Sequence, residues 1–204
     1  EREEKYQLYI NAVAASLDYF AQKYGAQPVI IGMEALDFDP INLLKSRMKT
    51  KTEVFSSKFY DGYQLAGILR SLSVLVTSRY HARVLSMPGG VPSIAVSMDE
   101  RLFNLLSESG HLKDYYLSTD EENLEVKLKG ALDKIWPNKE KVREEILRTI
   151  PRYLKTMSEM GKFFRGYVEK NFPGIKLAPE PKDWTGYLPP LHPGLKSILE
   201  KYGS

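Results

Sequence analysis

Short, continuous apolar stretches alternate with helical segments in the first half of this chain. The stretches cover residues 28–33, 74–77 and 91–96, and each is too short to be a buried helix. The stretch at residues 28–33 is unbroken, a pattern typical of a strand that is buried on both faces. Helical periodicity fills the intervals between the stretches, and it also precedes the first stretch, over residues 6–24. Strands that alternate with helices predict an α/β fold with an open, parallel, Rossmann-like sheet.

Residues that begin or end elements divide this half further. Gly25 ends the first helix, and residues 53–55 are expected to form a second strand. Asp39 is followed by Pro40, a pair typical of a helix N-cap with proline at the first helical position. Asp61 is expected to cap the helix after the second strand.

The second half of the chain is helical and then rich in proline. Long charged patterns predict helices over residues 123–136 and 138–172, and Pro151 is expected to kink or divide the second one. Residues 173–193 contain six of the 12 prolines and predict an extended strap. A short helix over residues 195–202 is expected to close the chain.

Length and composition fit one packed domain with an extension. From the 204 residues we predict a Rossmann-like domain over residues 1–120 and, over residues 121–204, a helical extension with a strap packed on that domain. A net charge of +3 is too small to indicate a nucleic-acid partner. The absence of cysteine excludes disulfides and thiolate chemistry. No apolar run approaches the roughly 20 residues of a membrane span, and the charged first residues do not resemble a signal peptide.

The segment after the strand at residues 74–77 is the main candidate for an anion site. Ser78, Arg79 and His81 fall at the edge where open parallel sheets bind ligands. Backbone N–H groups at the start of the next helix favour an anion, and Arg79 offers a planar charged fork that suits phosphate or carboxylate. His81 can exchange a proton near neutral pH. By pattern alone, an arginine and a histidine at a strand end are more often ordinary surface or capping residues.

Other polar residues follow the ligand-binding ends of the first two predicted strands. Glu34 and Asp37 follow the first strand and are candidate contacts for the hydroxyls of a saccharide acceptor. Ser56, Ser57 and Lys58 follow the second strand and are candidate contacts for a donor. Both sets would lie at the same sheet edge as Arg79.

The remaining histidines and the glycine pair have no functional interpretation. His111 follows Gly110 at a helix end, where a histidine meets the negative end of the helix dipole, so we interpret it as structural. His192 lies in the strap, and the sequence suggests no partner for it. Gly89 and Gly90 lack the spacing of a dinucleotide-binding loop.

Residues 69–82 read LRSLSVLVTSRYHA, an aliphatic strand followed by Ser-Arg-Tyr-His-Ala. This order resembles the hallmark segment of the polysaccharide pyruvyl transferase family. The resemblance continues through the Gly-Val-Pro turn into the strand at residues 90–96. It extends to Met-Asp-Glu-Arg at residues 98–101, where the family commonly has an aromatic residue, an acidic residue and then a lysine. The similarity covers residues 6–117.

The resemblance implies a transferase that moves pyruvate from phosphoenolpyruvate to a sugar of a cell-surface or exported polysaccharide. Arg79 and Ser78 would bind the donor, Arg101 would be a second cationic contact, and His81 would act as the acid or base. The family's chemistry requires no metal ion, and phosphoenolpyruvate is a co-substrate with no other cofactor. We expect a cytoplasmic protein associated with envelope polysaccharide synthesis.

The resemblance also implies that this chain is one half of the enzyme. The family has two Rossmann-like domains that face a cleft, as in glycosyltransferases of the B type, and this chain matches the C-terminal, donor-binding domain without its first strand. The isolated chain is then expected to be inactive without the N-terminal domain. Two alternatives stay open: a half-domain like that of a B-type glycosyltransferase or sugar-nucleotide epimerase, and a non-catalytic module that binds a saccharide or an anion.

Overall fold

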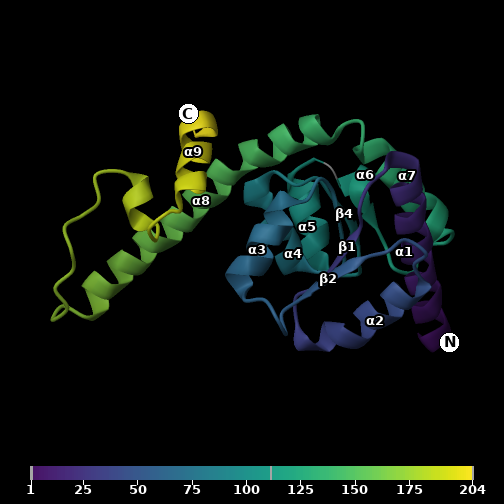
Figure 1. Ribbon diagram of the computed structural model, residues 1–204. Helices are drawn as coiled ribbons and strands as arrows, with labels where there is room; N and C mark the ends of the chain where they lie inside the picture. Colours follow the sequence, from purple (N-terminus) through teal and green to yellow (C-terminus); the bar gives the residue numbers. More distant parts are fainter. Residues whose placement is uncertain (1, 111, 204) are drawn as a thin grey trace. The chain divides into compact units, whose positions relative to one another are not determined.

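The computed structural model describes residues 2–110 and 112–203, which divide into two compact units (Figure 1). The first unit is Glu1–Glu144 and the second is Glu145–Ser204. This division differs from the boundary expected at residue 120, because α7 (Leu124–Ile135) packs against α1 (Arg2–Tyr24) inside the first unit. His111 lies outside the described residues, so its structural role stays a prediction.

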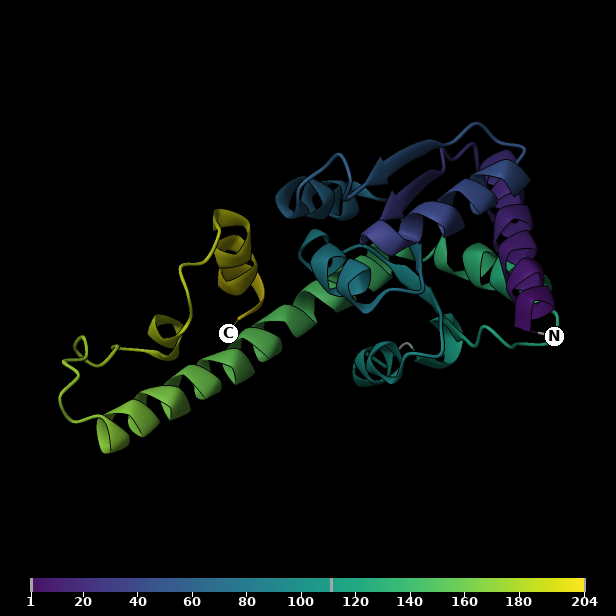
Figure 2. The same ribbon diagram turned by 90° about the horizontal axis from the view of Figure 1, so that it is seen from below.

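The first unit is a mixed α/β structure with parallel strands. β1 (Val29–Gly32) pairs with β2 (Glu53–Ser56), and Figure 2 shows the two arrows side by side. β3 (Leu75–Thr77), β4 (Ser93–Val96) and β5 (Tyr116–Leu117) form a second sheet in that order. Among the described residues no strand pairing joins β1 to β3, so two small sheets stand where the sequence predicts one. β5 has only two residues, too few to show a hydrophobic period, and sequence patterns do not predict it.

Helical segments connect each strand to the next, as parallel pairing requires. Gly25 ends α1 in the left-handed region, at φ 63°, which a residue without a Cβ adopts at little cost. In chain order the remaining helical elements of the first unit are η1 (Ala35–Asp37), α2 (Phe38–Arg47), α3 (Gly62–Ser71), α4 (Tyr80–Ser86), η2 (Met87–Gly89), α5 (Glu100–Glu108) and α6 (Leu112–Tyr115).

The two predicted N-caps have different outcomes. Asp61 caps α3 as predicted, because its carboxylate accepts hydrogen bonds from the backbone N–H groups of Tyr63, at 2.8 Å, and Gln64, at 2.9 Å. The prediction for Asp39 is wrong. The 3-10 turn η1 runs directly into α2, so Asp37 takes the N-cap position and Asp39 lies inside the first turn of the helix.

Apolar side chains from helices and strands form the core of the first unit. One cluster joins Leu69 of α3, Leu75 of β3, Ala82 of α4 and Val91, all buried. A second cluster joins Ala95 of β4 to leucines of α5. All four residues of β4 are buried, as expected for a strand covered on both faces.

A cluster of polar and aromatic groups joins α1 to α7. Asp133 of α7 accepts hydrogen bonds from the hydroxyls of Tyr19, at 2.7 Å, and Tyr24, at 2.9 Å, and from Lys23 Nζ at 2.8 Å. Burial alone would raise the pKa of Asp133, but these three donors outweigh it and lower the pKa below its ordinary value of 3.8. The negative charge of Asp133 therefore contributes to the packing of the two helices.

The second unit consists of a long helix, a strap and a short helix. α8 (Lys139–Asn171) enters this unit at residue 145 and continues through Pro151 as one helix, so the division predicted there is not observed. The strap contains η3 (Trp184–Tyr187) and packs closely on α8, where a Cβ on Gly161 would lie 2.4 Å from the Tyr187 carbonyl oxygen. In the strap, His192 caps α9 (Pro193–Tyr202), because Nδ1 accepts a hydrogen bond from Gly194 N at 3.2 Å.

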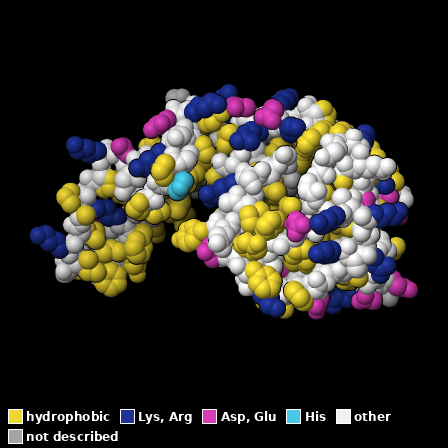
Figure 3. Space-filling model, viewed as in Figure 1, with side chains coloured by type: hydrophobic (Ala, Val, Ile, Leu, Met, Phe, Trp, Pro, Cys, Tyr) yellow, Lys and Arg dark blue, Asp and Glu magenta, His cyan; other side chains and the backbone are white. Residues whose placement is uncertain are grey.

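The second unit exposes large hydrophobic side chains along α8 and the strap (Figure 3). Phe163 is 78% exposed, and Met160 and Phe164 are nearly as open. Beyond Ile150 the described residues include no buried hydrophobic side chain. No helix in the described ranges combines the length and the apolar character needed to cross a membrane.

Candidate functional site

The predicted anion-binding segment lies at the carboxyl end of β3, where the sequence places it. A tight turn follows Thr77, whose Oγ1 accepts a hydrogen bond from Arg79 N at 2.9 Å and donates one to the Arg79 carbonyl oxygen at 3.1 Å. Ser78 and His81 are exposed, and α4 begins at Tyr80 directly after the turn. The turn therefore directs the chain from strand to helix and leaves these side chains at the edge of the sheet.

Arg79 forms ion pairs with Glu34 and Asp37, two of the acidic residues that follow β1. Its guanidinium Nη2 donates to Asp37 Oδ1, and Nη1 lies 3.4 Å from Glu34 Oε2. The structure thus brings together Arg79, the expected donor contact, with Glu34 and Asp37, the expected acceptor contacts. The carboxyl ends of β1 and β3 meet through this ion-pair cluster.

Asp37 is the better-anchored of the two acids. Its second oxygen, Oδ2, accepts hydrogen bonds from Met33 N at 2.9 Å and Glu34 N at 3.0 Å, and its side chain is 13% exposed. Glu34 is 52% exposed and makes the longer contact with Arg79. The hydrogen bond to Asp37 raises the pKa of Arg79 against the opposing effect of partial burial, and the two negative charges add to the increase. With two carboxylates around one guanidinium, Arg79 is still 43% exposed, and opening the weaker contact, that of Glu34, would free a further N–H group for an anion.

Arg101 and His81 lie with a second acid, at the carboxyl end of β4. Asp99 caps α5 and accepts three hydrogen bonds from Arg101, at 2.9 Å from the backbone N, 3.0 Å from Nε and 2.7 Å from Nη2. These bonds lower the pKa of Asp99. The Arg101 guanidinium also lies 5.1 Å from the centre of the Tyr80 ring, and the centre of the His81 ring lies 5.6 Å from that of Tyr80. Arg101 and His81 therefore contact the same aromatic ring.

An open cavity of about 600 Å³ lies beside Ser78 and Met98, at this same edge. α1 contributes Arg2, Lys5, Tyr6 and Tyr9, and Thr119 and Asp120 complete the lining. Burial is the main cause that raises the pKa of both tyrosines above the ordinary value of 10.0. Sequence reasoning did not identify this contribution of α1, because a charged helix start has the same pattern whether it faces solvent or a cavity.

The candidates after β2 are engaged in local structure. Ser56 is buried, and its Oγ accepts a hydrogen bond from Lys58 N at 3.3 Å. Ser57 N donates to the Gly32 carbonyl oxygen at 3.0 Å and so extends the pairing of β1 with β2. Lys58 Nζ lies 5.2 Å from the Phe38 ring centre and 5.5 Å from that of Phe59. These contacts explain the three residues without a ligand.

The described part of the chain has no cluster of three or more histidine or acidic side chains suited to a metal ion. Comparisons with protein-family models, with curated proteins and with solved structures each gave no match. The chemistry of this edge of the sheet is therefore argued from its own geometry.

Proposed function

We propose that this chain is the donor-binding, C-terminal half of a polysaccharide pyruvyl transferase. One observation carries the proposal: Ser78, Arg79, His81 and Arg101 lie at the carboxyl ends of two neighbouring parallel strands, and Ser78 also lines an open cavity with basic and hydroxyl-bearing residues. This combination of cations, hydroxyl donors and a histidine suits phosphoenolpyruvate, which carries a phosphate and a carboxylate. The choice of this family is supported by the resemblance of residues 69–101 to its hallmark segment.

The proposed fold is Rossmann-like, within a two-domain enzyme of the glycosyltransferase B type. The support is the parallel direction of the strands, the helices between them and the position of the cationic residues at the strand ends. The saccharide and the rest of the cleft would come from an N-terminal domain.

The chemistry assigns different tasks to the residues. Formation of a ketal adds a proton to the methylene carbon of phosphoenolpyruvate, forms two C–O bonds from sugar hydroxyls to the central carbon and releases phosphate. One hydroxyl proton accounts for the new methyl group and the other leaves with phosphate. Arg79 would hold the phosphate or carboxylate of the donor once Glu34 moves aside, while Asp37 keeps the guanidinium in place. His81 would carry a proton, either to the methylene carbon or from a hydroxyl.

Binding of phosphoenolpyruvate to the chain itself tests the donor site. We expect Arg79→Ala to weaken binding about tenfold or more, because a charge-assisted pair is lost, in calorimetric titrations with phosphoenolpyruvate at low salt. Arg143→Ala, at an exposed arginine of α8, is the matched control and is expected to bind like the unmodified chain. Equal affinity of the two variants would contradict the donor site.

The reaction needs a separate assay, with the two-domain protein that the proposal implies. Phosphate release from phosphoenolpyruvate that depends on a saccharide supports pyruvyl transfer. No release together with tight binding of nucleotide-sugars would support the glycosyltransferase or epimerase alternative. Saccharide binding without turnover, retained in Arg79→Ala, would support a binding module that does not use this segment.

A further inference from the structure

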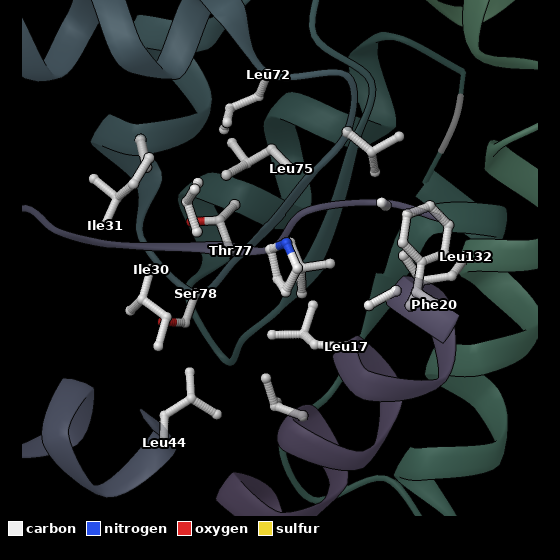
Figure 4. A pocket seen from close by; sticks show the side chains of 18 of the residues that line it. Leu17, Phe20, Ile30, Ile31, Leu44, Leu72, Leu75, Thr77, Ser78 and Leu132 are labelled. Atoms are coloured by element: carbon white, nitrogen blue, oxygen red, sulfur yellow. The ribbon is translucent and has the colours of Figure 1, made fainter. Parts of the chain in front are cut away.

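An apolar cavity of about 800 Å³ lies between the two sheets of the first unit, along the edges of β1 and β3 (Figure 4). Its lining includes three consecutive residues of β1 and all three residues of β3. Successive side chains of a strand point to opposite faces, so a cavity that touches consecutive residues runs along the strand edge. We call this cavity the slot.

The backbone hydrogen bonds show which peptide groups face the slot. Leu75 N donates to the Pro92 carbonyl oxygen, towards β4, at 2.9 Å. In a parallel strand the peptide groups of successive residues point to alternate sides, so those of Val76 point away from β4 and into the slot. Likewise the Gly32 carbonyl accepts from Ser57 N, towards the β2 side, at 3.0 Å, so the peptide groups of Ile31 point to the other side. The edge of β1 and the edge of β3 thus both direct backbone N–H and C=O groups into the slot.

Apolar side chains from helices cover the slot. Figure 4 shows Leu17 and Phe20 of α1 and Leu44 of α2 around the same cavity as Ile30 and Leu75. A backbone N–H or C=O in such surroundings is costly unless it has a hydrogen-bond partner. An apolar ligand would fill the space but leave these groups without partners. Another strand would supply both apolar side chains and a hydrogen-bond ladder on each side.

The course of α1 indicates where such a strand would connect. Arg2 and Tyr6, at the start of α1, line the open cavity with Ser78 and Met98, so this end of the helix lies at the carboxyl ends of β3 and β4. The other end, Tyr24, leads to the amino end of β1. A strand that runs parallel to β1 and β3 within the slot therefore finishes where α1 begins.

We propose that the slot is the seat of a further parallel β-strand, supplied by the polypeptide segment that leads into α1. The strand order then becomes β2-β1-new-β3-β4-β5, which joins the two small sheets into one doubly wound sheet. Four residues would match β1 in length, and all of them would be apolar because both faces of the slot are covered. The slot reaches Asp37, Ser78 and Arg79 of the candidate site at one end. The proposal itself rests on the backbone geometry of β1 and β3 and does not depend on which reaction that site performs.

The test is an extension of the full chain at its N-terminus. A strand of about five valine and isoleucine residues is joined to α1 through a short glycine-serine turn. The control extension has the same length but has proline at every second position, because proline cannot donate to a ladder. The readout is hydrogen exchange of single backbone amides, measured by NMR, together with the melting temperature.

The apolar extension is expected to slow exchange of the Val76 and Ile31 amides by about 100-fold. The Leu75 and Ser57 amides, which already have partners, should change much less. The melting temperature should rise by about 5 °C or more, and the proline control should leave both readouts unchanged. Unchanged exchange at Val76 and Ile31 with the apolar extension would overturn the proposal.

Two further experiments test whether a separate peptide or a second copy of the chain fills the slot instead. A free peptide with the same valine and isoleucine sequence is added to the unextended chain, and the mass of that chain is measured by light scattering across a range of concentrations. If the free peptide protects Val76 while the extension does not, the strand is not supplied through α1 and the proposal fails. It also fails if the unextended chain dimerises and the dimer already protects these amides. A monomer that gains protection only from the extension supports it.

Discussion

The two units of this protein use hydrophobic residues in opposite ways. In the first unit, side chains such as Leu69 and Ile94 are fully buried between strands and helices. In the second unit, Phe163 and Phe164 of α8 stand largely in solvent. Burial of apolar area is the main source of folding free energy, so the first unit has a packed core and the second depends on helix formation and local contacts. The same residue type therefore has different consequences in the two units.

The largest expected effect is a truncation in the first core. Leu69→Ala should lower the free energy of unfolding by about 3 kcal/mol, because the side chain is fully buried and leaves a cavity. The measurement is urea unfolding followed by Trp136 fluorescence in a Trp184→Phe background, which reports on the first unit alone. Leu36→Ala, at a leucine that is 82% exposed, is the matched control and should change the value by less than about 0.5 kcal/mol. A similar loss in the free energy of unfolding for Leu69→Ala and Leu36→Ala would contradict the idea that burial of Leu69 stabilises the first unit.

A smaller effect is expected at the polar junction of α1 and α7. Asp133→Asn should cost about 1 kcal/mol at pH 7, since it weakens three hydrogen bonds but the carboxylate is one third exposed and screened by solvent. The pKa of Asp133 is lowered in the folded state, so its contribution is present above the ordinary value of 3.8. That contribution is lost as the pH falls through the folded pKa.

The difference between Asp133→Asn and the unmodified protein should therefore shrink as the pH falls below the ordinary carboxyl pKa of 3.8 and through the lower pKa of folded Asp133. Unfolding curves at several pH values measure it. A difference that stays constant with pH would show that the charge of Asp133 contributes nothing.

The smallest effect is expected on the second unit. Phe163→Ser should change the free energy of unfolding by less than about 0.5 kcal/mol, because the ring is already 78% exposed. It should, however, reduce binding of a hydrophobic fluorescent dye. Phe20→Ser, at a buried ring of α1, is the contrasting variant and should destabilise the protein strongly. A large loss of stability in Phe163→Ser would show that this ring is covered in solution.

Local sequence patterns predicted the elements but not the contacts between them. The apolar runs identify β1, β3 and β4, and Asp61 identifies the start of α3, because these signals depend on neighbouring residues alone. The ion pair between Arg79 and Asp37 depends on the spatial meeting of residues 42 positions apart, which no local pattern contains. The wrong prediction at Asp39 has a similar cause, since the N-cap position passed to Asp37 through a 3-10 turn that the sequence does not signal.

The sequence predicted where the candidate site residues lie along the sheet, but it did not predict the ion pairs that they form. Ser78, Arg79 and His81 lie at the strand end that the pattern indicates. The resemblance assigned Arg79 and Arg101 to a donor and said nothing of acidic partners, whereas each forms an ion pair with an aspartate. Charged residues near the same sheet edge neutralise one another when their side chains can reach, and reach is a property of the folded chain.

The contact between Arg79 and Asp37 also bears on the rate of folding. It closes a loop that contains α2, β2 and α3, so its formation has to overcome the entropy of joining distant residues, and we expect it to form late in folding. Interactions that form after the transition state affect unfolding more than folding. We therefore expect this ion pair to slow the opening of the folded chain while leaving its folding rate almost unchanged.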